Sequence, residues 1–177
     1  ALIGEKSLSG IWGPVSKILG VSGEYVTAIE TALGSAVSNI VVEDEQSAKD
    51  AIRFLKRTNA GRATFLPLTS ISSRTINEQG LDTMQGFIGI ASELVTFDKK
   101  YTCIAENLLG RTVVADNIDN ASNIAKKYSY KYRIVSLDGQ IINSGGSYTG
   151  GSASAKTGIM SRSADISQLD EAISKTK

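Results

Sequence analysis

The sequence predicts a mixed α/β protein of two related lobes, each a small sheet flanked by helices, with coiled-coil stubs at both ends. Three observations predict this fold. Short β-branched runs alternate with amphipathic helical patterns, their order repeats once along the chain, and apolar residues recur every seven residues near the C-terminal end. With 177 residues, of which 41% are hydrophobic, the chain is long enough for one domain or two small lobes.

The first lobe is predicted to begin with two helices. Pro14 suits the first turn of a short helix that Gly20 ends. Ser22 is placed to cap a second helix, because serine at this position accepts hydrogen bonds from free backbone N–H groups. The apolar face of that second helix is expected to contain Tyr25, Ile29, Ala32, Leu33 and Ala36.

A strand, a helix and a second strand are predicted next. Residues 39–43 are short and β-branched, and Asp44 follows as the expected N-cap of a helix over 45–58. A second strand covers 63–66 and ends at Pro67, and the polar stretch 69–86 is expected to connect the lobes as a loop or short helix. The inner face of the 45–58 helix is expected to hold Ala48, Ala51, Ile52 and Leu55.

The second lobe repeats the order of the first. In both copies a helix ending in Leu-Gly leads to a β-branched strand, an aspartate that is expected to cap the next helix (Asp44 or Asp116), and a further strand. Two such lobes are expected to pack about a pseudo-twofold axis. The residues of the first helical pattern, Tyr25, Glu30, Leu33 and Gly34, correspond to Tyr101, Glu106, Leu109 and Gly110.

The predicted organisation has four parts. Residues 1–13 are a coiled-coil stub and entry, 14–80 the first lobe with its connector, 81–155 the second lobe, and 156–177 the start of a returning coiled coil. The last part carries the heptad positions, and because it is too short to be stable alone, the sequence is expected to be a piece of a longer protein. The apolar heptad residues are Ile159, Ile166, Leu169 and Ile173.

Composition removes many kinds of chemistry. The chain has no histidine, which excludes Ser-His-Asp and Cys-His catalysis and histidine-ligated zinc. Cys103 is the single cysteine, is expected to be a small buried hydrophobe, and cannot form an internal disulfide. The acidic pairs Asp44/Asp116 and Glu30/Glu106 assemble no reaction, so we expect no enzyme, no metal and no cofactor. A net charge of +1 and the lack of a long apolar run predict a soluble, cytoplasmic protein with no membrane partner.

Residues 145–151 contain two glycine pairs after an apolar run. Glycine loses more conformational entropy on folding than other residues, so four glycines at the end of a strand need a structural or functional reason. Three interpretations compete: a phosphate-cradling loop, a flexible tail, and a place where a second chain packs. The phosphate interpretation rests on 150–157, which matches G-x-x-x-x-G-K-[ST] except that Ala155 replaces the second glycine. Gly158 follows Thr157 where that loop needs a helix, so a small nucleotide-binding domain is the alternative function and not the favoured one.

A basic cluster interleaved with tyrosines is typical of nucleic-acid surfaces, since lysines neutralise phosphates and tyrosine rings stack on bases. For Tyr128, Tyr130 and Tyr132 we favour a role in the core, because they alternate as a helix runs into a strand. The basic side chains remain open to either role. They are Lys126, Lys127, Lys131 and Arg133.

An ordered set of motifs over nearly the whole chain resembles the hinge domain of bacterial structural maintenance of chromosomes (SMC) proteins. The set comprises Gly13-Pro14 and the segments 25–34, 41–44, 61–67, 92–95, 107–110, 132–135, 137–139 and 145–151. The resemblance implies a homodimerising hinge at the tip of a long antiparallel coiled coil, which joins two ATPase arms in chromosome condensation and segregation. ATP would bind only in head domains, whose motifs these residues lack.

The resemblance also implies site residues and a place in the cell. The dimer-contact glycines of the family fall on Gly145, Gly146, Gly150 and Gly151, where a Cβ would hold the chains apart. Weak, non-specific DNA binding and a cytoplasmic, nucleoid-associated location are implied as well. The expected DNA-binding residues are Lys126, Lys127, Lys131, Arg133, Lys156 and Arg162.

Overall fold

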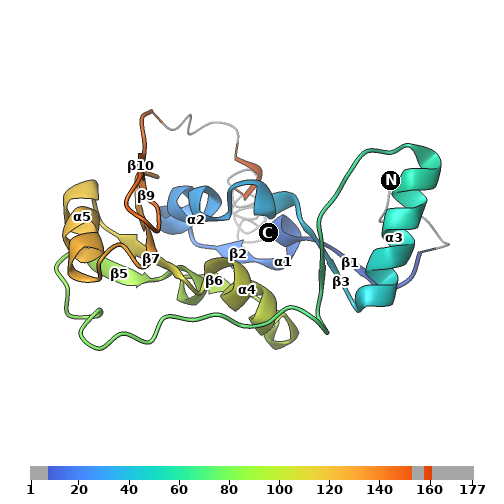
Figure 1. The fold of residues 1–177 in the computed structure, drawn as a ribbon, viewed down its shortest axis with the longest axis horizontal. Coiled ribbons are helices and arrows are strands. Elements are labelled where there is room, and N and C mark those ends of the chain that lie inside the picture. Colours follow the sequence, from blue (N-terminus) through green and yellow to red (C-terminus); the bar gives the residue numbers. More distant parts are fainter. Residues whose placement is uncertain (1–7, 153–157, 161–177) are drawn as a thin grey trace, which may run out of the picture.

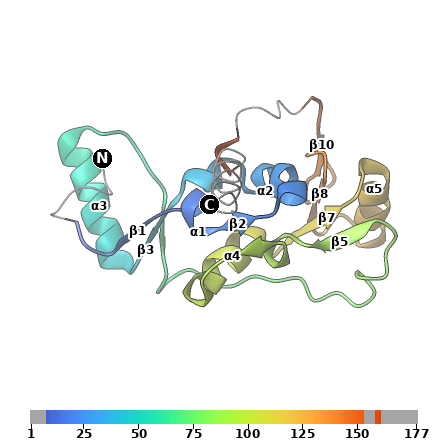
Figure 2. The same cartoon turned by 180° about the vertical axis from the view of Figure 1, so that it is seen from behind.

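A computed structural model describes residues 8–152 and 158–160 of the chain. Figures 1 and 2 show an elongated molecule, with α3 (Glu45–Thr58) at one end and α5 (Ile118–Lys127) at the other. The helices α2 (Val26–Leu33) and α4 (Thr102–Leu109) lie between these ends. Leu169 and the heptad positions from 166 onward lie outside the described residues, as do Lys156 and Arg162.

The first lobe is a three-stranded sheet in the order β1-β3-β4. β1 (Ile11–Pro14) runs antiparallel to β3 (Ile40–Val42), which runs parallel to β4 (Phe65–Pro67). Parallel neighbours need a long crossover, and α3 provides it. Asp44 caps α3 as predicted, because its carboxylate accepts from the Ser47 N–H at 2.8 Å.

The second lobe repeats this pattern and extends it. β5 (Phe87–Ile90) pairs antiparallel with β7 (Thr112–Ala115), which runs parallel to β8 (Arg133–Ser136) with α5 as crossover. The paired positions shift at the same place in both lobes, before Gly13 in β1 and before Gly89 in β5. The predicted repeat is therefore present in three dimensions. Two further strands, β9 (Ile141–Ile142) and β10 (Tyr148–Thr149), extend the sheet to the order β10-β9-β8-β7-β5.

The lobes meet at an antiparallel pair of very short strands, β2 (Gly20–Val21) and β6 (Val95–Thr96). Gly20 pairs with Thr96, and these two residues occupy equivalent positions, since each precedes the repeated tyrosine, Tyr25 or Tyr101, by the same distance. Two equivalent residues that pair with each other lie on either side of a twofold axis. The expected pseudo-twofold axis therefore passes between Gly20 and Thr96.

Short helical segments complete the lobes and are also repeated. α1 (Val15–Ile18) follows β1, and the 3-10 turn η4 (Ala91–Glu93) takes the corresponding place after β5. The turns η2 (Gly23–Tyr25) and η5 (Lys99–Tyr101) lead into α2 and α4. The turn η3 (Gly34–Ser38) extends only the first copy, and Ala36 lies in it rather than on α2.

The main core lies between the lobes. Ile29 of α2 and Ile104 of α4 are fully buried there, with strand residues from both sheets. A second cluster lies beneath α5 and contains the buried Ile124 and Tyr132, with Tyr128 and Tyr130 packed against it, as we expected for the tyrosines. Cys103 packs, partly buried, against the main core.

Three details of the sequence prediction were wrong. The Ser22 side chain forms no cap hydrogen bond, since its backbone carbonyl accepts from Tyr25 in a 3-10 turn instead. Asn117, not Asp116, caps α5, because its side chain accepts from the Asn120 N–H. Ile52 is 52% exposed rather than internal, because it lies at the edge of the stripe that Ala48, Ala51 and Leu55 bury.

The boundaries predicted between the four parts of the chain stay a prediction. The boundary expected between residues 13 and 14 falls inside β1. Within the ranges that the structure describes, no helix is long and apolar enough to cross a bilayer.

Replacing Ile104 by alanine tests the shared core. Because Ile104 is fully buried between the lobes, we expect the free energy of unfolding to fall by about 2–5 kcal/mol. Ile52→Ala is the matched control and should change it by no more than about 0.5 kcal/mol. Urea unfolding of both variants measures the difference, and equal costs would contradict the assigned core.

Candidate functional site: the glycine segment and the open sheet edges

The first glycine pair forms the turn between β9 and β10. Gly145 and Gly146 have φ angles of +90° and +99°, which residues with a Cβ rarely adopt. The Gly145 N–H donates to the Tyr130 carbonyl and the Gly146 N–H to the Asn143 carbonyl, both at 2.9 Å. The positive φ angles therefore give these two glycines a role within the chain, and the two hydrogen bonds tie the turn to the second lobe.

The second glycine pair follows β10 and is held by Gln140. The Gln140 side chain accepts from the Gly151 N–H at 2.9 Å and donates to the Gly151 carbonyl at 3.1 Å. A Cβ on Gly150 would collide with this amide, so the Gln140 side chain would have to move to accept a larger residue there. Gly151 has a φ of +137°. A flexible tail does not have such contacts, so these residues belong to the lobe.

The space around the four glycines differs. A Cβ on Gly146 would contact the Tyr130 ring at 3.5 Å, whereas a Cβ on Gly145 or Gly151 would meet nothing within 4 Å. Two of the glycines thus border open space, where a second backbone can approach. A shallow groove of about 270 Å³ lies beside the second glycine pair, lined by residues that include Thr31, Ile141 and Ser152.

β10 is the outer strand of its sheet, and both of its residues are exposed. Tyr148 is 52% exposed, and its hydroxyl lies 2.9 Å from the Ser122 Oγ. Figure 1 shows β10 at the margin of the second lobe. An outer strand with unpaired N–H and C=O groups is a template for another strand.

In the first lobe, β4 is likewise an outer strand. The Thr64 carbonyl and the Leu68 N–H bond to β3, so by alternation the N–H of Phe65 points away from the sheet. Pro67 has no N–H to lose, which suits an outer strand. In the second lobe the corresponding strand, β8, has β9 as its antiparallel neighbour, but β4 has none within the described residues.

The predicted basic cluster divides in two. Lys126 and Lys127 lie exposed on the last turn of α5. Lys131 is exposed but pairs with Glu78, whose Oε1 lies 2.5 Å from the lysine Nζ. This hydrogen bond raises the pKa of Lys131 and, together with one from the Tyr132 hydroxyl, lowers the pKa of Glu78.

Arg133 does not belong to the exposed cluster. Its guanidinium reaches from β8 into the other lobe and donates to the Ala32 carbonyl at 2.8 Å and to the Thr31 carbonyl at 3.4 Å. Burial lowers the pKa of Arg133, and its Nε has no partner among the described residues. Arg133 therefore caps the C-terminal end of α2, where the negative end of the helix dipole favours a cation. Sequence reasoning missed this contact, because Arg133 and Thr31 are 102 residues apart along the chain.

The phosphate-loop motif ends in residues 153–157, which the structure does not describe. Where it is described, its first part, from Gly150 to Ser152, is bound to Gln140. The same part of the chain, outside the gaps, contains no group of three residues that could hold a metal ion.

A duplicated α/β domain whose outer strands β10 and β4 can each accept another strand has the features of a protein-assembly module. The family model of the SMC proteins flexible hinge domain matches residues 8–125. The chain is 42% identical to the SMC hinge domain of Geobacillus stearothermophilus, solved as an asymmetric dimer; the match covers 95% of this chain and 71% of that one, with a TM-score of 0.83. The Pyrococcus furiosus SMC hinge domain is 31% identical over 85% of this chain and 77% of its own, with a TM-score of 0.72.

The curated relatives are chromosome partition proteins. The Bacillus subtilis protein Smc is 39% identical over 97% of this chain, and the Methanocaldococcus jannaschii protein Smc is 42% identical over 93%. The chain spans only 15% and 14% of those proteins. This chain belongs to the family of SMC flexible hinge domains, as its motifs predicted, and a hinge is an assembly module rather than a catalyst.

Arg133→Met tests the role of the half-buried guanidinium. The variant keeps an apolar stem but leaves two carbonyls of α2 without a donor, so we expect the free energy of unfolding to fall by about 1–3 kcal/mol. Arg53→Met is the control, because Arg53 forms an exposed pair with Asp50 worth about 0.2–1 kcal/mol. If urea unfolding gave the two variants the same stability, the capping role would be contradicted.

Proposed function

We propose that this chain is the homodimerising hinge of a chromosome-partition SMC protein, where it joins two coiled-coil arms. Its family membership and its relatives named chromosome partition protein Smc support this. ATP binding is a property we propose for head domains beyond these residues. The location follows from the same proposal: the protein acts in the cytoplasm, on the nucleoid.

The observation that carries the proposal is the pair of open edges, β10 beside Gly145 and Gly151, and β4 in the other lobe. β8 pairs with β9 on the side where β4 has no neighbour, so the first lobe has room for one more strand. We propose that β10 of one copy fills this room in the other. Twofold symmetry then forms two equal contacts, and the backbone hydrogen bonds of each extend a sheet across the dimer.

Changing Gly145 and Gly151 to valine tests this interface. Each new side chain enters space that is empty in the single chain but would be occupied by the partner. We expect the dimer to weaken by about tenfold or more, which is ~1.4 kcal/mol. Sedimentation velocity over a concentration series measures the dissociation constant.

Gly80→Val is the matched control, because Gly80 has a similar φ of +80°, its nearest neighbour is 3.8 Å away, and it lies in the connector. It should be strained to a similar degree but remain dimeric. An undiminished dimer in the Gly145 and Gly151 variants would mean that the interface lies elsewhere. A wild-type chain that stays monomeric at high concentration would refute homodimerisation itself.

We also propose weak, non-specific DNA binding by the exposed basic residues. Lys126 and Lys127 support it, since they lie side by side on the surface without an acidic partner in the described ranges. Lys131 contributes less while Glu78 neutralises it. Lys156 and Arg162 remain candidates from the sequence.

Replacing Lys126 and Lys127 by glutamate should weaken binding to a short duplex at low salt. Each lysine that contacts a phosphate contributes about 0.9 to the slope of log affinity against log salt, so we expect the slope to fall by about 2. Fluorescence anisotropy across a salt series measures both quantities.

The matched control is Lys49→Glu with Lys56→Glu on α3, which changes the net charge equally at the other end of the molecule. It should leave the slope nearly unchanged. Glu78→Gln should strengthen binding, because it frees Lys131. Equal losses in both double variants would show that net charge alone attracts the DNA, and no binding at low salt would refute the proposal.

A further inference from the structure

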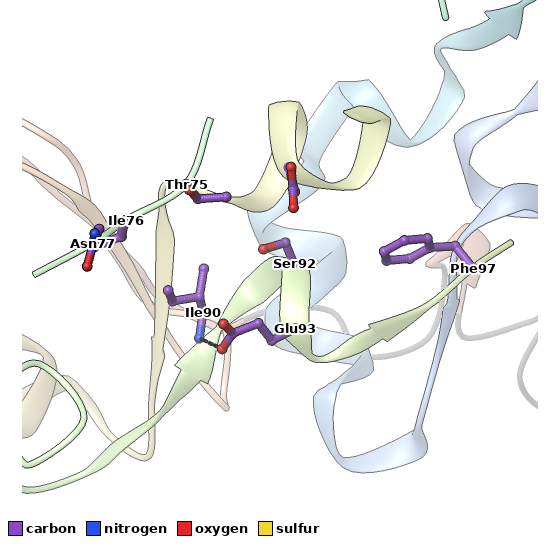
Figure 3. Close-up of a pocket in the computed structure, with 8 residues that line it drawn as sticks. Thr75, Ile76, Asn77, Ile90, Ser92, Glu93 and Phe97 are labelled. Carbon is purple, nitrogen blue, oxygen red and sulfur yellow. Dashed lines mark hydrogen bonds between the residues drawn. The ribbon is translucent and has the colours of Figure 1, made fainter. Parts of the chain in front are cut away.

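The second lobe contains an open cavity of about 490 Å³ between α4, η4 and the connector. Figure 3 shows its lining side chains. Glu93 and Glu106 supply two carboxylates, and Ile76, Ile90 and Phe97 form apolar walls. Thr75 and Asn77 complete the side that the connector forms. The volume is in the range of small-ligand sites.

The carboxylates of this cavity have no cationic partner. Neither Glu93 nor Glu106 forms a salt bridge with any residue that the structure describes. The Glu93 carboxylate accepts one long hydrogen bond, 3.4 Å from the Ile90 N–H, and the Glu106 carboxylate accepts none from the described residues. The exposed Glu93 and the half-buried Glu106 thus border the same open cavity with unused acceptor capacity.

Ser92 adds a third polar group to the lining of this cavity. It is only 8% exposed, lines the cavity, and its hydroxyl has no hydrogen-bond partner within the described residues. In Figure 3 its side chain points into the space between Thr75 and Glu93, and the Phe97 ring extends toward it. The hydroxyl opens onto the cavity, where a ligand with N–H or O–H groups would pair with it.

The other lobe shows what a glutamate at this position binds. Glu30, the counterpart of Glu106, accepts a hydrogen bond from the Met160 N–H at 2.5 Å, and Met160 is buried. The residue that corresponds to Glu93 there is Lys17, so the first lobe has its own cation where the second has a carboxylate. The second lobe therefore has the same acceptor without a donor and with one more negative charge.

We propose that this cavity binds an alkylammonium group, the chemistry shared by a free polyamine and a lysine side chain. The ammonium has three N–H donors for the Glu93 and Glu106 carboxylates and the Ser92 hydroxyl. The alkyl chain packs on Ile76 and Ile90, and the Phe97 ring attracts the cation. This site is separate from the proposed dimer edges and does not depend on them.

Titrations of the whole chain with spermidine and with Nα-acetyl-lysine amide, followed by amide NMR shifts, test the proposal. We expect saturable binding that shifts Ser92, Phe97 and Asn77, and a loss of about tenfold in affinity in both Glu93→Gln and Glu106→Gln. Gln keeps the shape of the side chain, and thermal unfolding confirms that the variants fold. Asp82→Asn removes an exposed charge elsewhere and should change nothing.

Binding of both probes supports the shared chemistry, and binding of one alone identifies a polyamine or a lysine side chain as the source. Nα-acetyl-norleucine amide has the chain without the charge, so equal binding of this compound would overturn the proposal. Equal weakening by Asp82→Asn would also overturn it, because the probes would then be held only as diffuse counterions. The absence of saturable binding would overturn it outright.

Discussion

The structure depends on the packing of the two copies against each other across the β2–β6 strand pair. Ala28 and Ile29 of α2 correspond by position to Ile104 and Ala105 of α4, and all four residues are fully buried. Each copy thus contributes one large and one small side chain, in opposite order. Such an exchange keeps the total volume of the shared core constant while the symmetry becomes approximate. Neither lobe has a core of this size alone, so the lobes are expected to unfold together.

Approximate symmetry also explains how the copies took different roles. The second sheet has five strands and the first has three, because β9 and β10 extend only the second. The extra hairpin supplies an outer strand, and the shorter sheet leaves β4 without the neighbour that β8 has. The contact from Arg133 to the end of α2 fixes the second sheet against the first lobe. Both edges are therefore presented in a fixed relative orientation, as a symmetric dimer requires.

Much of the fold could be predicted because its longer elements carry periodic patterns. The repeat, the α3 helix with its Asp44 cap and the loop character of 69–86 follow from residues that act locally. β2, β6, β9 and β10 have two residues each, which is too short for any periodicity, and only tertiary pairing defines them. The interlobe contact of Arg133 could not be predicted for a similar reason, since its partners lie in the other lobe. The glycine segment was found because its composition is costly, but its spatial neighbours were not predictable.

The glycine segment combines two features: glycines with unusual backbone conformations and an unpaired strand, β10. Positive φ angles account for Gly145, Gly146 and Gly151 without any partner, and Gln140 accounts for Gly150. Intrachain constraints thus explain why four glycines are present. They do not explain why β10 is left unpaired between them, since an exposed edge with no side-chain protection favours aggregation unless another strand covers it. The turns set by the glycines hold this edge in place, and Gly145 and Gly151 leave the approach to it open. The edge, rather than any single glycine, is the feature that a partner chain would recognise.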